Sequence, residues 1–166
     1  MALTDGQSVQ VGIAAGLALT AVGGCSQSST KVMTNGDSVF TIAGGPIKVH
    51  AIVSECITAN DGTATTMQWQ HNPTVGSAKT ISAASAALTS LAAGGTVRLN
   101  QTSLATAPNV VTAANGGVQI GANVGNHMTL GAGVVKLVVA TGQTTGTWRH
   151  SMLYEPMAPN TTVTAA

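Results

Sequence analysis

The strongest constraint on the fold is a series of short β-branched runs, each bounded by turn residues. The clearest run is IKVHAIVSECI at Ile47–Ile57, where the odd positions are apolar except Glu55. This alternation is typical of a strand with one buried face, and it predicts that the odd positions face the core. Turn signals stand on both sides of the run, at Gly44-Gly45-Pro46 and Asn60-Asp61-Gly62.

Similar runs recur along the chain and predict about eight strands with at most one short helix. The most hydrophobic run, Val134–Ala140, is expected to be a central strand, and the Ala- and Leu-rich Ser82–Ala93 is the single candidate helix. An antiparallel sandwich or barrel fits this pattern, and we expect an all-β, jelly-roll-like β-sandwich. The other expected strands are 38–42, 63–71, 79–81, 96–100, 118–120, 127–130 and 147–154.

The chain is expected to consist of an N-terminal arm, residues 1–30, and a β-sandwich domain, residues 31–166. The arm is rich in Gly, Ala, Ser and Gln, and its apolar run VGIAAGLALTAVGGC ends in a lipobox-like motif at Cys25. A secretion signal needs a positive segment before the apolar run, but the first ten residues contain Asp5 and no Lys or Arg. The run is also too short and too rich in Gly to span a bilayer.

Charge is scarce, and this excludes several classes of function. Only 7% of the residues are charged and 2% are aromatic, with six Lys plus Arg and five Asp plus Glu. Enzymes need clustered titratable groups, and nucleic-acid binders need basic patches. We therefore expect a non-enzymatic structural protein that binds neither nucleic acid nor membrane. We expect part of its stability to come from oligomerisation, because small residues make a modest core.

No motif in the chain indicates a catalytic, cofactor-binding or metal-binding residue. The four histidines lack the spacing of metal ligands, and the five acids are spread along the chain, so paired carboxylates for a depolymerase are not expected. Asp61 is explained by its turn. Cys25 and Cys56 are interpreted as free thiols, with Cys56 a small buried hydrophobe in a strand. The histidines are His50, His71, His127 and His150.

The two tryptophans, Trp69 and Trp148, have two readings. They are either anchors in the core or at an interface, which we favour, or an exposed platform on which sugars stack. For contact with a partner the sequence points to the arm, to Trp148 and to an expected loop at residues 101–117.

Two segments resemble small tailed-phage virion proteins that decorate capsids. The segment VVKLVVATGQTTGTWRHSMLYEPMAPNTTV, which starts at Val134, is similar to their final hairpin. The segment VFTIAGGPIKVHAIVSECITANDGTATTMQW, which starts at Val39, is similar to their opening hairpin. The resemblance covers about residues 35–164 in pattern and leaves out the arm, and other phage head and tail accessory proteins share these moderately specific motifs.

The resemblance implies a β-sandwich cement protein of the virion, assembled in the host cytoplasm. Such proteins commonly form homotrimers on the outer surface of an icosahedral capsid, where they join neighbouring major capsid protein subunits. Many equivalent sites on the shell give avidity to small contacts, and the arm is expected to add a strand to a sheet edge there. The alternatives are a tail, baseplate or head-fibre component, and a carbohydrate-binding β-sandwich module.

Overall fold

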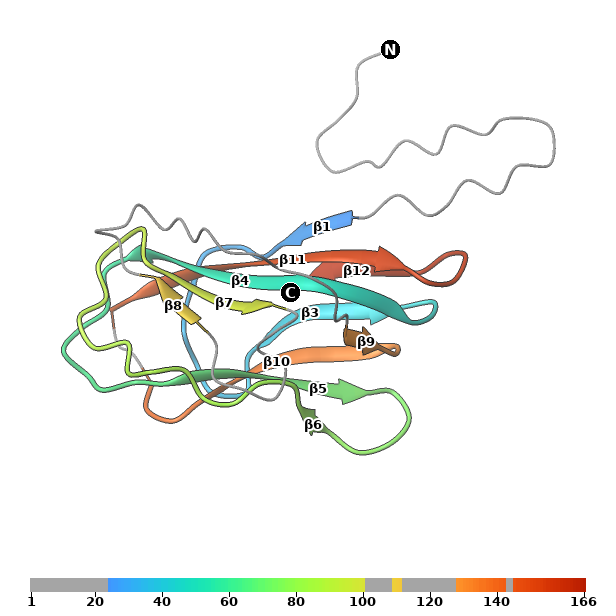
Figure 1. The fold of residues 1–166 in the computed structure, drawn as a ribbon. Coiled ribbons are helices and arrows are strands. Elements are labelled where there is room, and N and C mark those ends of the chain that lie inside the picture. The colour runs from blue at the N-terminus through green and yellow to red at the C-terminus, as the bar shows by residue number, and fades with distance from the viewer. Residues whose placement is uncertain (1–23, 101–108, 112–127, 143–144) are drawn as a thin grey trace, which may run out of the picture.

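The computed structural model describes residues 24–100, 109–111, 128–142 and 145–166 of the chain. These residues form two antiparallel sheets and contain no helix, so the expected all-β sandwich is confirmed (Figure 1). In sheet A the order is β1 (Gly24–Gln27), β11 (Thr147–Pro156), β4 (Ile47–Thr58), β7 (Thr96–Asn100) and β8 (Asn109–Val111). In addition, β2 (Lys31–Val32) pairs with β11, and β9 (Met128–Leu130) pairs with β4.

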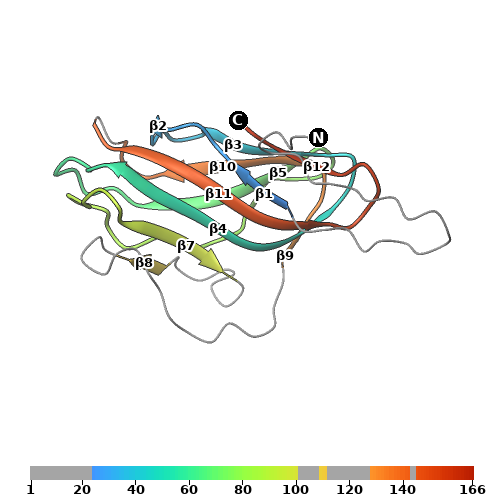
Figure 2. The ribbon, with the colours of Figure 1, turned by 90° about the horizontal axis from the view of Figure 1, so that it is seen from above.

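Sheet B has the order β12 (Thr162–Ala165), β3 (Ser38–Ala43), β10 (Gly133–Val139), β5 (Met67–Pro73) and β6 (Lys79–Thr80). The expected central position of the most hydrophobic strand is confirmed, because β10 lies between β3 and β5. Figure 2 shows the sandwich from above, with β7 and β8 on one side and β3 and β12 on the other.

The strand pairs are nested along the chain. The outermost pair, β1 with β11, encloses β3 with β10, which encloses β4 with β7, which encloses β5 with β6. Successive pairs alternate between sheet A and sheet B. These four pairs therefore form one long antiparallel ribbon, folded over so that successive pairs lie in opposite sheets.

The inward side chains of both sheets form one core. Burial of these aliphatic and aromatic groups is the main stabilising contribution, because each removes apolar area from water. The largest fully buried members include Trp148, Met152 and Ile52 from sheet A and Trp69, Phe40 and Leu137 from sheet B.

The alternation of β4 changes phase inside the strand, so the prediction that all its odd positions face the core is wrong. Ile47 and Val49 are buried as expected, but beyond them the even positions Ile52, Ser54 and Cys56 face inward. The pairing with β11 passes from Val49 to Ala51 at this point, which leaves one extra residue in β4. Such a β-bulge turns every following side chain to the opposite face.

The expected helix at Ser82–Ala93 does not form. The Ser82 and Ser85 hydroxyls accept hydrogen bonds from the backbone N–H groups of Trp69 and Met67, at 3.1 and 3.0 Å. The backbone of the segment also bonds to β5 and its approach, and Leu88 and Leu91 enter the core. Because the segment is fastened beside β5, these tertiary contacts replace the bonds that a helix would make within itself.

Some expected features lie at or beyond the limits of the described residues. Strand β1 belongs to the segment assigned to the arm, but it pairs with β11, so residues 24–27 are part of sheet A. Residues 1–23, the expected strand 118–120 and all of the expected loop except β8 lie outside the described residues. Strand β12 forms within the Thr-rich C-terminal segment, where no strand was expected.

Candidate functional site

The outer face of sheet A, around β1, β11, β4 and β7, is the candidate functional site. Strand register places its outward residues in rows across the sheet. One row joins Cys25, Leu153 and Ala51, and the next joins Gln27, Ser151, Val53 and Arg98. A third row contains Arg149, Glu55 and Thr96.

The β-bulge in β4 creates this surface. It turns Ala51, Val53 and Glu55 outward, whereas an unbroken alternation would have turned all three positions toward the core. The sequence does contain a signal for this change, because Ile52 and Cys56 interrupt the polar even positions of the run. Reading that interruption as a bulge would have moved the outward set by one residue.

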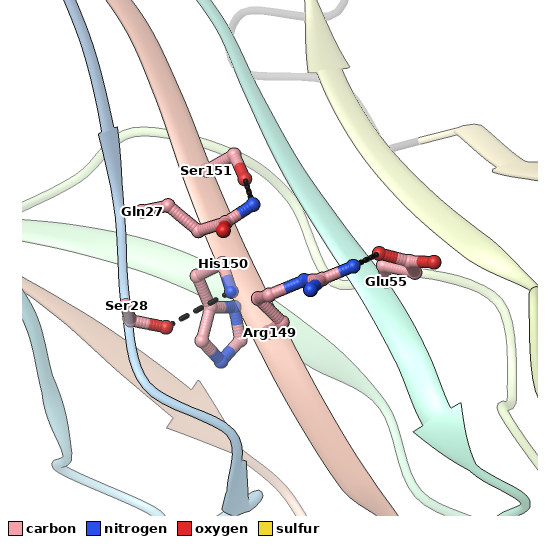
Figure 3. Close-up of polar contacts among 6 residues, drawn as sticks. All are labelled: Gln27, Ser28, Glu55, Arg149, His150 and Ser151. Carbon is pink, nitrogen blue, oxygen red and sulfur yellow. Dashed lines mark hydrogen bonds and ion pairs between the residues drawn. The ribbon is translucent and has the colours of Figure 1, made fainter. Parts of the chain in front are cut away.

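Polar contacts stabilise the geometry of this face (Figure 3). The Arg149 guanidinium donates to the Glu55 carboxylate, with 2.6 Å between Nη2 and Oε2, and the Gln27 amide donates to the Ser151 hydroxyl at 3.1 Å. The Arg149–Glu55 side chains are 38% and 39% exposed, so water screens the ion pair and it adds little to stability. Its main effect is to hold the two long side chains in a defined position beside Val53.

An apolar row lies beside these polar contacts. Leu153 is 49% exposed and lies between Cys25 and Ala51 in adjacent strands. Among the described residues, the other exposed large hydrophobic side chains are Val75 and Met157, and neither lies in a strand. The face therefore joins an exposed aliphatic side chain, an ion pair and the cation of Arg98 within neighbouring strands.

The inner side of the same strands holds a buried histidine, His150. Its Nδ1 lies 2.6 Å from the Ser54 hydroxyl, and its backbone N–H donates to the Ser28 hydroxyl at 3.0 Å (Figure 3 shows the Ser28 contact). Its Nε2 is buried with no partner in the described part of the chain. Burial, and to a smaller extent the nearby Lys31 cation, together lower the pKa of His150 from 6.5 to about 4, so the ring is neutral at pH 7.

The Ser54–His150 pair has the composition of a nucleophile and its base, but not the setting. Both side chains are 0% exposed, so a substrate has no access to the Ser54 hydroxyl in this structure. The pair instead links β4 to β11, and the contact of His150 with Ser28 links β11 to the segment after β1. The role of the Ser54–His150 pair is therefore to hold these segments together.

The two tryptophans are both core residues. Each is 0% exposed, so neither Trp69 nor Trp148 provides a platform for sugar stacking, and the prediction that Trp148 contacts a partner is wrong. The Trp148 indole donates to the Asn60 side-chain oxygen at 2.9 Å. The Asn60 amide in turn donates to the Leu88 carbonyl at 2.9 Å, so this residue joins the core to the 82–93 segment. The expectation that the tryptophans act as anchors is confirmed within the core.

The remaining candidate residues are dispersed. Cys25 is an exposed free thiol, whereas Cys56 is buried as expected, and burial raises the pKa of its thiol. The Asp61 side chain accepts a hydrogen bond from the Thr63 backbone, which confirms its role in the turn. His71 is buried with Nε2 3.1 Å from the Gly131 carbonyl oxygen, and burial lowers its pKa although that contact opposes the shift.

One further charged group lies at the far end of sheet A. The Glu155 carboxylate is 3.5 Å from both Lys48 Nζ and His50 Nε2.

Within the described ranges, no group of three or more His, Cys, Asp or Glu gathers as a metal ion would require, and His127 lies outside those ranges. In the same ranges, no helix has the length and apolar character needed to cross a membrane.

Comparison of this chain with protein-family models, with curated proteins and with solved structures finds no match.

Proposed function

We propose that this chain is a non-enzymatic structural protein of a virion. It binds the outer surface of an icosahedral phage capsid and cements neighbouring major capsid protein subunits. Its copies gather as homotrimers, which multiplies small contacts with the shell into a stable attachment.

The observation that carries this proposal is the outer face of sheet A. It combines the exposed Leu153, the Arg149–Glu55 ion pair and Arg98 on adjacent strands. A surface that carries an exposed aliphatic side chain and two arginines on neighbouring strands suits contact between proteins. The Ser54 hydroxyl and the His150 imidazole lie beneath this face and are buried, so solvent does not reach them.

The topology adds support of a general kind. Nested strand pairs that alternate between two sheets are what a jelly roll requires, and we infer that the sandwich is of this type. Jelly rolls occur in viral capsid proteins and in lectins, so the topology alone does not separate these roles. The carbohydrate-binding alternative loses its main argument, because both tryptophans are buried.

Single-particle imaging of purified virions tests the proposal, with the density searched for this two-sheet sandwich. We expect density at three-fold positions on the outer shell. Density confined to the tail or baseplate would replace the capsid role by the tail alternative. Absence of the chain from the particle would overturn the virion proposal.

A further inference from the structure

We propose that the outer face of sheet A is the docking surface, and that it takes a patch of the shell protein with a carboxylate beside an apolar site. In this arrangement Arg98 pairs with the carboxylate, and Leu153 covers the apolar site. The inference rests on the proposed function, and it specifies which of the two sheets faces the shell and what the shell must present.

The charge of Arg98 is the first part of the argument. Arg98 projects from β7 beside Val53, and no ion pair satisfies it within the described part of the chain. The nearest acid along the rows, Glu55, is already held by Arg149 at 2.6 Å. Of the five acids of the chain, Asp5 lies outside the described residues, and residues 101–127 contain none. A guanidinium without an ion pair among the described residues suits a carboxylate from another protein, with which it can bond through two nitrogens.

The position of Leu153 is the second part. It lies on the same face as Arg98, in a row with Ala51 and Cys25, and almost half of it is exposed. Among the described strands it is the one large hydrophobic side chain that is exposed to this degree. Covering such a side chain removes apolar area from water, so it supplies affinity where Arg98 supplies orientation.

The outer face of sheet B provides the contrast. Its central cation is Lys136, which lies between Ser38 and Gln70 in the neighbouring strands and has no ion pair in the described ranges. The described strands of sheet B expose no large hydrophobic side chain as Leu153 is exposed. Lys136 is therefore the control for Arg98, because both are outward cations that have no ion pair in the described ranges.

The experiment measures binding of the full chain to purified capsids from which this protein has been stripped. Arg98→Glu is compared with Lys136→Glu, and Leu153→Gln with Val138→Gln, the last being an outward residue of β10 that is paired with Gln68. We expect Arg98→Glu to weaken binding by about tenfold or more, and Leu153→Gln by several-fold. The two sheet B variants should bind within about twofold of the wild type. Circular dichroism of all four variants is the check that each is folded.

A second arm identifies the partner group. Replacing acidic residues of the shell protein by lysine, one at a time, should weaken binding of the wild type and restore binding of Arg98→Glu at one position. Failure of every position to do so would contradict an Arg98–carboxylate contact.

The outcomes separate the two proposals. Binding of the wild type with equal losses for Arg98→Glu and Lys136→Glu would overturn the docking face and leave the capsid role intact. Loss confined to Lys136→Glu would assign docking to sheet B. If the wild-type chain does not bind stripped capsids at all, the proposed function fails, and the docking inference fails with it.

Discussion

The two sheets share one core but differ in where they carry polar groups. Sheet A holds charged side chains on its outer face, such as Glu55 and Arg149, and a buried polar cluster around His150 on its inner face. Sheet B is largely apolar inside, and its strands carry lysines and uncharged polar groups outside, among them Lys136 and Gln70. The same strand alternation builds both sheets, so the difference comes from the residues at equivalent positions.

The buried polar groups of sheet A help to hold its edge strand, β1. Strand β1 contributes no residue to the apolar core, so hydrophobic burial does little to hold it. Its attachment depends on its ladder with β11, on the Gln27–Ser151 hydrogen bond and on the contact of Ser28 with His150. In sheet B, strands β3, β5 and β10 each place a large side chain in the core, namely Phe40, Trp69 and Leu137. His150, Trp148 and Glu55 of sheet A have counterparts in sheet B, namely His71, Trp69 and Lys136.

The largest expected effect is acid destabilisation through His150. In the folded chain its pKa is lowered from 6.5 to about 4, chiefly by burial. Below pH 6.5 the His150 ring therefore takes up a proton in the unfolded chain but not in the folded chain. The free energy of unfolding falls as the pH is lowered from 6.5 to about 4. The loss is about 3 kcal/mol, which denaturant unfolding at pH 7, 5.5 and 4 measures.

The histidine of sheet B is the control for this prediction. His150→Gln should remove most of the difference between pH 7 and pH 4. His71→Gln should change it less, because the hydrogen bond of His71 with the Gly131 carbonyl opposes the lowering of its pKa by burial. A larger flattening of the pH profile by His71→Gln would contradict this assignment.

The tryptophans give the next effect. The Trp148 indole N–H is bonded to Asn60, whereas the Trp69 indole N–H is buried without a partner in the described ranges. Trp148→Phe should therefore reduce the free energy of unfolding by about 1–3 kcal/mol more than Trp69→Phe, because it leaves the buried Asn60 oxygen unpaired. Chemical denaturation of both variants at pH 7 measures the difference, and equal losses would show that Asn60 is not held by Trp148.

The smallest effect concerns the outer faces. Glu55→Gln removes the ion pair with Arg149, and it should lower stability by at most about 1 kcal/mol because the pair is partly exposed. Lys136→Gln should change stability by less, since it breaks no ion pair among the described residues. Repeating both measurements in high salt should shrink the Glu55→Gln effect. An effect that salt leaves unchanged would point to a role other than charge.

Sequence patterns predicted the fold class and much of the core. The run at Val134–Ala140 is a central strand, Cys56 is buried and both tryptophans are anchors, because local hydrophobicity and burial agree at these positions. The 82–93 segment was wrongly predicted as helix, because Ser82 and Ser85 bond to a strand that is distant in sequence. Trp148 was wrongly predicted as a contact residue, because it is buried in the core and bonds to Asn60, which is distant in sequence.

The sequence by itself determined that this chain forms strands and turns, since alternation and turn residues act within a few neighbours. It also determined that charge would be sparse on any surface the chain formed. Only the tertiary structure decided which side chains of different strands share a face. A single bulge in β4 turns Ala51, Val53 and Glu55 outward, and the register with β11 and β7 then sets Arg149, Leu153 and Arg98 around them. Register depends on pairing between distant segments, which no local pattern encodes.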